Sequence, residues 1–191
     1  MPVLPIVTYN DPVLRQKTSP VQENSEELQA LIESMFQTMY HASGVGLAAP
    51  QIGSLLRAFV IDADSITSKE EDIEFGPLAF INPEIIEHKG PKVKMEEGCL
   101  SIPEVRDDVT RPQSVIINYL DREFNRQQLE LSGWLSRVVQ HEYDHLNGVL
   151  FLDHLSSFRR RLHRSVLRDI EQGMVETEYP VVSKNNEELK I

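Results

Sequence analysis

One short string, HEYDH at residues 141–145, has the residue types and spacing best suited to chemistry in this chain. Two histidines four residues apart on a helix lie about 40° apart around its axis and about 6 Å apart along it, so both imidazoles can face one metal ion. A metal that holds a reactive water needs a third protein ligand, and Cys99, the only cysteine, can supply it. With Glu142 beside His141 and His145, these residues predict a site for metal-assisted hydrolysis.

Other assignments of the same residues are open. A protease-type zinc site would take its third ligand from downstream, where the possible ligands are His154, His163, Glu171 and Glu176. His154 lies outside the longer histidine-rich pattern of such enzymes, and His163 falls on an arginine-rich face. A nucleophilic Cys99 with a histidine as its base is a further alternative. It leaves the histidine pair at helical spacing unexplained, so we favour Cys99 as the metal ligand.

A second segment, GVGLAAPQ at residues 44–51, contains two closely spaced glycines. It fits the GxGxxA dinucleotide-binding pattern, but that pattern needs a strand before it and a helix after it, whereas here a helix precedes it and Pro50 follows. Gly44 and Gly46 can instead let backbone amides approach a peptide-like substrate. Gln51 can then donate a hydrogen bond to a developing oxyanion. The alternative is an ordinary tight turn with an exposed glutamine.

Hydrophobic periodicity predicts three helices. The first runs between an N-cap at Ser25 and Gly44, and the second covers 132–147 and carries both histidines. The third lies near the C-terminus, and its apolar stripe would contain Leu155, Phe158, Leu162, Val166 and Ile170.

Short apolar and β-branched runs predict strands, and these cover 58–62, 78–82, 114–120 and 127–131. Residues 2–21 are expected to form an extended arm, and the acidic residues 64–74 an exposed loop or hairpin tip. The predicted fold class is α+β. Short antiparallel sheets would surround a central helix that carries the HExxH-type metal motif, with one helix near each terminus.

Size and composition limit the class of protein. The 191 residues carry a formal net charge of −11, which argues against a DNA-binding surface. We expect a single catalytic domain over 1–173 and a polar tail with little order over 174–191. No signal-peptide pattern is evident, and no apolar run approaches the roughly 18 residues of a membrane span. With one cysteine, these features predict a cytoplasmic protein without membrane association.

Three segments together resemble a known family. Residues 44–51, 97–101 (EGCLS) and 140–145 (QHEYDH) resemble, in order and position for position, the three signature motifs of peptide deformylases. The likeness runs from about residue 3 to residue 153, beginning with an arm similar to that of the family. It implies hydrolytic removal of the N-formyl group from the initiator methionine of new polypeptides, with release of formate. It also implies an α+β fold and ferrous iron, with zinc, nickel or cobalt as substitutes.

The resemblance also implies roles for single residues. The metal ligands would be Cys99, His141 and His145. Glu142 would move protons, while the Gln51 amide and the backbone N–H of Leu100 would stabilise the oxyanion. The substrate would be bound by Gly44, Val45, Gly46, Trp134, Val138 and Arg106. Arg137 departs from an apolar residue common in the family, so we expect it to alter the methionine pocket.

Some features have two readings. Asp144 either braces the site by pairing with Arg111 or is a solvated surface carboxylate. The last helix is basic, and its arginines are Arg159, Arg160, Arg161, Arg164 and Arg168. They form either a solvated face or a surface that docks on the ribosome through phosphate contacts. For the whole chain, the alternatives to a deformylase are an endopeptidase of the HExxH type and a non-catalytic module stabilised by a metal.

Overall fold

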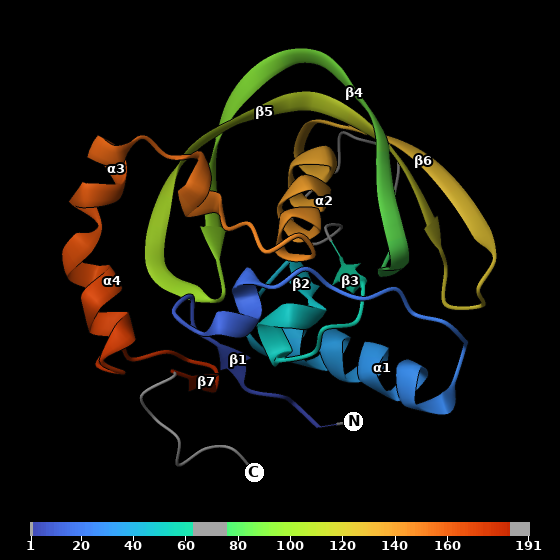
Figure 1. Ribbon diagram of the computed structural model, residues 1–191, viewed down its shortest axis with the longest axis horizontal. Coiled ribbons are helices and arrows are strands. Elements are labelled where there is room, and N and C mark those ends of the chain that lie inside the picture. The colour runs from blue at the N-terminus through green and yellow to red at the C-terminus, as the bar shows by residue number, and fades with distance from the viewer. Residues whose placement is uncertain (1, 63–75, 184–191) are drawn as a thin grey trace.

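The computed structural model describes residues 2–62 and 76–183, which form the predicted α+β fold around one central helix (Figure 1). The α-helices are α1 (Glu26–His41), α2 (Gly133–His145), α3 (Ser157–Leu162) and α4 (Arg164–Glu171). The 3₁₀-helices are η1 (Pro12–Arg15), η2 (Ala49–Ile52) and η3 (Phe151–His154). The strands are β1 (Ile6–Val7), β2 (Gly46–Ala48), β3 (Ala58–Ile61), β4 (Leu78–Cys99), β5 (Ile102–Leu120), β6 (Arg126–Ser132) and β7 (Val181–Val182).

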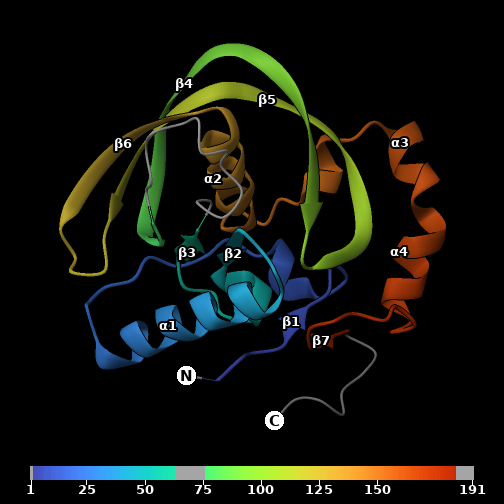
Figure 2. The same cartoon turned by 180° about the vertical axis from the view of Figure 1, so that it is seen from behind.

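The main sheet is antiparallel, with the strand order β2-β3-β4-β5-β6. Its longest pairing joins β4 to β5, from Ile81 opposite Leu120 to Cys99 opposite Ile102. The two strands form an arch over α2, which is visible from both sides (Figures 1 and 2). The arch places Cys99, at the turn between these strands, near the helix that carries the histidines.

The strands β4 and β5 are much longer than the sequence predicted. The expected run 78–82 is only the first part of β4, and the run 114–120 is only the last part of β5. The rest of both strands is rich in charged residues. From Glu84 to Glu96 the residues of β4 are exposed or half-buried, so they lack the apolar alternation that identifies a strand. Register shifts between Lys89 and Lys92, where Gly90 has a φ of 73°, interrupt the pairing locally.

Two apolar clusters hold α1 and α2 in place. Ser25 caps α1 as predicted, because its hydroxyl accepts a hydrogen bond from the N–H of Leu28. The first cluster packs α1 against β2 and β3 and includes Leu28, Ile32, Met35, Met39, Leu47 and Val60. The second packs α2 beneath the sheet and includes Phe59, Phe80, Ile117, Val138 and Val139. The apolar side of α2 is therefore fixed, and this sets the direction of the histidines.

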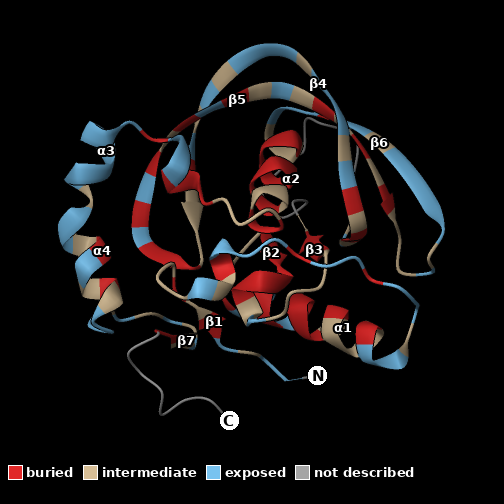
Figure 3. Cartoon of the chain, viewed as in Figure 1, coloured by how far each residue is buried: buried red, intermediate tan, exposed pale blue. Residues whose placement is uncertain are grey.

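The predicted C-terminal helix is divided into η3, α3 and α4. Leu155 and Ile170 are buried as expected, but Phe158 and Leu162 are 69% and 63% exposed. The reason is that α3 turns a different face to the protein, since Arg159 and His163 bind the buried Asp107 on β5. Figure 3 accordingly shows most of α3 as exposed.

Residues beyond Gly173 are better ordered than predicted. Val181 and Val182 form β7, which pairs in parallel with Ile6 and Val7 of β1. The expectation of little order in this tail is wrong as far as Ser183, because backbone hydrogen bonds to the N-terminal arm hold it. The acidic segment 64–74 and residues 184–191 lie outside the described residues. Within the described ranges, no helix is both long enough and apolar enough to cross a bilayer.

Candidate active site

The helix α2 and the turn after β4 bring Cys99, His141 and His145 together. One possible ligand atom from each residue lies within 4.8 Å of the other two. The Sγ atom of Cys99 is 3.3 Å from Nε2 of His145, and the two imidazole centroids are 5.1 Å apart. Both histidines are buried, so the cluster lies at the inner end of the site.

The donor set fits a transition-metal ion. One thiolate and two imidazoles are ligands that zinc and ferrous iron accept, and three protein ligands leave a position for water. His141 Nδ1 is 3.0 Å from Oε2 of Glu97, so Nε2 is the nitrogen left for a metal. Burial lowers the pKa of His145 well below its ordinary value, because it disfavours the charged form of this imidazole.

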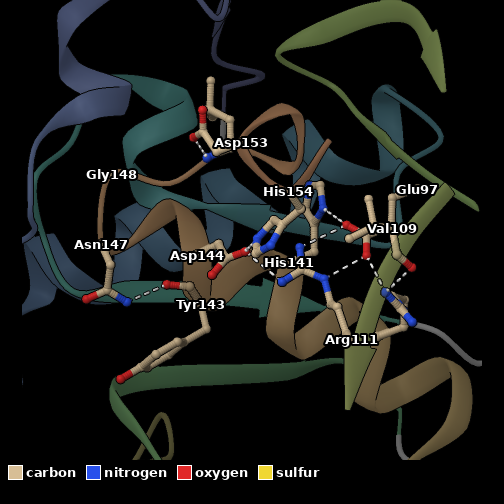
Figure 4. Close-up of polar contacts among 12 residues, drawn as sticks. Glu97, Val109, Arg111, His141, Tyr143, Asp144, Asn147, Gly148, Asp153 and His154 are labelled. Carbon is tan, nitrogen blue, oxygen red and sulfur yellow. Dashed lines mark hydrogen bonds and ion pairs between the residues drawn. The ribbon is translucent and has the colours of Figure 1, made fainter. Parts of the chain in front are cut away.

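A buried carboxylate, Glu97, orients His141. Arg111 donates to it through two nitrogens, at 2.7 and 3.0 Å (Figure 4). Arg137 also donates to it, at 2.8 Å. Burial alone would raise the pKa of Glu97, but the hydrogen bonds from His141 and Arg111 outweigh it and hold that pKa well below its usual range. Glu97 is thus a fixed negative charge behind His141, a predicted metal ligand. Glu97 is part of the EGCLS motif, but no spacing in the sequence predicted its contact with His141.

The predicted pairing of Asp144 with Arg111 is confirmed. Arg111 Nη1 is 2.7 Å from Oδ2 of Asp144, and Figure 4 shows the two side chains meeting beside α2. The same oxygen lies 2.7 Å from Nε2 of His154. Burial would raise the pKa of Asp144, but the contacts with His154 and Arg111 lower it. His154 is therefore engaged with Asp144 rather than directed into the Cys99 cluster.

The guanidinium of Arg137 serves the same network. It donates to Glu97 and to the backbone carbonyls of Val109 and Val93, at 3.0 and 2.7 Å. The residue is buried, and it also lines the cavity described below. Arg137 therefore helps to balance the buried negative charge of Glu97. An apolar residue at this position could not do so.

Glu142 is a carboxylate in very different surroundings. It is buried, and burial raises its pKa to about 7. Its Oε2 atom has no hydrogen-bond partner within the described part of the chain. A Cβ atom on Gly46 would come within 2.5 Å of its Oε1, so only glycine fits opposite this carboxylate.

Gln51 presents its amide nitrogen to the cluster. Its Oε1 accepts a hydrogen bond from the N–H of Ala48 at 2.8 Å, which fixes the orientation of the amide. The Nε2 atom then lies 3.5 Å from Sγ of Cys99 and 3.3 Å from Oγ of Ser101. The side chain is buried rather than exposed, so the reading of this segment as an ordinary surface turn is wrong.

A cavity of about 500 Å³ opens onto these groups. Of the residues predicted for catalysis, metal binding or substrate binding, those that line it are Gly44, Val45, Gly46, Gln51, Cys99, Leu100, Arg106, Trp134, Val138, His141 and Glu142. His145 does not line it and is 1% exposed, although its Nε2 lies beside Sγ of Cys99. Arg106 lies at the mouth, with a side chain 71% exposed and 3.7 Å from Glu96. The arrangement can hold an extended peptide end against a metal, an acid–base group and an amide donor.

One part of this cavity was not foreseen from the sequence. The tail residues Glu176 to Tyr179 line it, and the hydroxyl of Tyr179 donates to the carbonyl of Leu100 at 2.8 Å. Burial raises the pKa of Tyr179 to about 12, so it is a hydrogen-bond donor at neutral pH. No periodicity or motif pointed to it, because its contact depends on how the two ends of the chain pair.

Comparisons with known proteins agree with this geometry. A family model described as polypeptide deformylase matches residues 3–161. A peptide deformylase from Salinibacter ruber is 54% identical over 189 residues, which cover 97% of this chain and 97% of that protein. One from Chlorobium phaeovibrioides is 46% identical over 179 residues, covering 94% of this chain and 92% of that protein.

A solved structure is also similar. The crystal structure of a peptide deformylase from Legionella pneumophila matches with a TM-score of 0.81 at 40% identity, and the match covers 90% of this chain and 96% of that one. The similarity therefore extends over most of the fold.

Proposed function

Because the chain belongs to the peptide deformylase family, metal-dependent hydrolases that remove the N-formyl group from newly made polypeptides, we propose which of its residues carry out that reaction. The observation that carries the proposal is that Cys99, His141 and His145 form one cluster, and that Glu142 and Gln51 line the same cavity as Cys99 and His141. This combination supplies metal ligands, an acid–base group and an oxyanion donor within reach of one substrate.

Cys99, His141 and His145 would hold the metal. We propose ferrous iron as the natural ion, with zinc, nickel or cobalt as substitutes, because a mixed thiolate and imidazole set accepts all of them. When bound, the ion supplies a water molecule of lowered pKa. Glu97 keeps His141 in the tautomer that directs Nε2 to the ion, and Arg111 and Arg137 keep Glu97 charged.

Glu142 would act as the general base and then the general acid. A pKa of about 7, raised by burial, suits a group that must both accept and release a proton near neutral pH. Its unpartnered Oε2 would take the proton of the attacking water. The same atom would then deliver this proton to the amine that leaves as the C–N bond of the formamide breaks.

Two donors would stabilise the negative oxygen of the tetrahedral intermediate. Gln51 Nε2 is aimed at the cluster by the hydrogen bond from Ala48, so it needs no reorientation during the reaction. The backbone N–H of Leu100 follows Cys99 directly and would be the second donor. Such fixed donors act mainly on the transition state, which is where catalysis requires them.

The substrate would enter as an added strand. Gly46 lies at the start of β2, an edge strand of the main sheet, where a peptide backbone can pair. Val45, Trp134 and Val138 would surround the methionine side chain, and Gly44 would allow the backbone to approach. Arg106 would contact the substrate at the mouth. Arg137 would narrow the floor of the methionine pocket while its charge remains bound to Glu97.

Formate release tests the reaction directly. The protein would be prepared anaerobically with ferrous iron and given a short formyl-Met peptide, with an acetyl-Met peptide as the control. We expect rapid formate production from the formyl peptide and no hydrolysis of the acetyl peptide. Absence of formate at confirmed metal occupancy would contradict the proposal. Cleavage of internal peptide bonds instead would favour an endopeptidase.

We also propose that the last helices dock on the ribosome and that the reaction takes place in the cytoplasm, where a thiolate ligand remains reduced. A second cavity of about 510 Å³ is lined by Arg160, Arg161, Arg164 and Arg168. Arg159 is not part of this surface, because it binds Asp107. The four arginines would form ion pairs with the phosphates of ribosomal RNA.

Co-sedimentation with ribosomes tests the docking. Reversing the charge at Arg160, Arg161 and Arg164 should abolish co-sedimentation in moderate salt. A control variant reverses three exposed basic residues on β4 and β6, namely Lys92, Lys94 and Arg126. Equal binding by both variants would show that these arginines are only a solvated face.

A further inference from the structure

The carbonyl of Leu100 is held by a residue from the opposite end of the chain. The hydroxyl of Tyr179 donates to it at 2.8 Å, across 79 positions of sequence. This carbonyl belongs to the same residue whose N–H would donate to the oxyanion in the proposed mechanism. The N–H and C=O of one residue are separated by only two rotatable bonds, so fixing the carbonyl restricts the direction of the N–H.

Tyr179 is itself held firmly. Pro180 follows it and restricts its backbone to extended conformations. On the far side, the N–H of Ile6 donates to the carbonyl of Pro180 at 2.9 Å, and the N–H of Thr8 donates to that of Val182 at 3.0 Å. The ring packs against the cluster that contains α1. The phenol is therefore presented to Leu100 by a backbone that is fixed next to it.

The rest of the Cys99–Ser101 turn is held by other contacts. The Leu100 side chain packs over Gly44, where an added Cβ would come within 2.8 Å of its Cδ1. The N–H of Tyr9 donates to the carbonyl of Ser101 at 2.9 Å. These contacts position the turn as a whole, whereas Tyr179 is the side chain that contacts the Leu100 carbonyl.

We propose that Tyr179 is a positioning residue for catalysis, which holds the carbonyl of Leu100 so that the N–H of the same residue points at the developing oxyanion. The tail residues 174–183 are then part of the catalytic domain, although they lie beyond the segment matched by the family model. This inference rests on the proposed function, because it needs the Leu100 N–H as an oxyanion donor. Tyr179 would act only through Leu100, without touching the reacting atoms.

The test compares two tyrosine-to-phenylalanine variants of the full chain loaded with ferrous iron. Tyr179→Phe keeps the ring and removes the hydroxyl that binds Leu100. Tyr40→Phe is the matched control, because its hydroxyl donates to Asp62 at 2.6 Å and the residue does not line the cavity. For each variant, kcat, KM for a short formyl-Met peptide, metal content and melting temperature are measured, with the inhibition constant of the deformylated product.

For Tyr179→Phe we expect kcat to fall about three- to tenfold, in line with the loss of one hydrogen bond, with KM and metal content unchanged. The product lacks an oxyanion, so its inhibition constant should not change. Tyr40→Phe should retain the wild-type kcat. A wild-type kcat in Tyr179→Phe, equal losses in both variants, or a change in KM alone would overturn the inference. If the wild-type protein releases no formate, the proposed function fails instead.

Discussion

Glu97 and Glu142 carry the same carboxyl group in opposite surroundings. Glu97 is buried among cationic donors, which lower its pKa, whereas Glu142 is buried without a cation bound to it, and its pKa rises to about 7. The surroundings of the two carboxyl groups therefore keep Glu97 charged and make Glu142 able to take up and release a proton near neutral pH. His141, one of the proposed metal ligands, lies between them in sequence and forms a hydrogen bond with Glu97.

Replacing Glu142 by alanine should abolish turnover while the metal stays bound. The expected loss in kcat is about 10²- to 10⁴-fold, the usual contribution of a general acid–base group. The measurement is kcat for a formyl-Met peptide, alongside metal content. Glu142→Gln, which keeps the size of the side chain, is the control and should be equally inactive. Near-normal activity in either variant would remove the acid–base assignment.

Replacing Cys99 by alanine should reduce metal affinity, because two imidazoles would remain as ligands. We expect the variant to retain little iron after dialysis and to lose activity in proportion. Metal content measured by elemental analysis checks this. Full occupancy in Cys99→Ala would mean that another residue is the third ligand.

Replacing Gln51 by alanine should lower kcat about 10²- to 10³-fold, as for other oxyanion donors, with less effect on KM. The fold is not expected to change, because the hydrogen bond from Ala48 is the main local loss. Steady-state kinetics at matched metal content measure the effect. An increase in KM with unchanged kcat would indicate a role in binding the ground state only.

At the scale of elements, β2 and α2 must approach closely. Gly46 on β2 faces Glu142 on α2, and a Cβ there would lie within 2.5 Å of the carboxylate oxygen. We expect Gly46→Ala to destabilise the protein by roughly 1–3 kcal/mol through this overlap. Urea unfolding of the variant measures the loss.

The double variant Gly46→Ala/Glu142→Ala tests the cause of that loss. Removing the Glu142 carboxylate also removes the overlap, so the double variant should be more stable than Gly46→Ala alone. Additive losses would show that the overlap with Glu142 is not the reason.

The sequence predicted the elements with apolar periodicity and the residues with motif spacing. The central helix, the cap at Ser25 and the Cys99 cluster follow from such local patterns. The outer part of β4 could not be predicted, because its charged residues face solvent on an arch and carry no alternation. The exposure of Phe158 could not be predicted either, since it depends on the distant Asp107 binding the other face of α3.

At the scale of the whole molecule, Asp107 connects the sheet to the last helices. It is buried on β5 and binds Arg159 and His163. The hydrogen bond from Arg159 is the main reason that the pKa of Asp107 is lowered, to about 2. A lowered pKa means that the stabilisation is complete above the unfolded-state value near 3.8 and is lost as the pH falls toward 2.

Asp107→Asn should therefore lower the free energy of unfolding at pH 7 by roughly 1–3 kcal/mol, the range for hydrogen bonds to a charged group. The difference from wild type should shrink between pH 4 and pH 2. Urea unfolding across this pH range measures it. Asp108→Asn is the matched control, because that side chain is 38% exposed, and it should have a smaller effect. A difference that does not vary with pH would contradict the assignment.

The pairing of β1 with β7 has a consequence for how the protein is made. Ile6 pairs with Val181, so the contact joins residues 175 positions apart. During synthesis the arm, the arch and α2 emerge well before residues 174–183, and contacts between such distant residues form slowly. A chain still being translated would thus have its histidines and cysteine in place before Tyr179 reaches Leu100. Full catalytic competence would therefore come late in folding, once the tail has paired with the N-terminal arm.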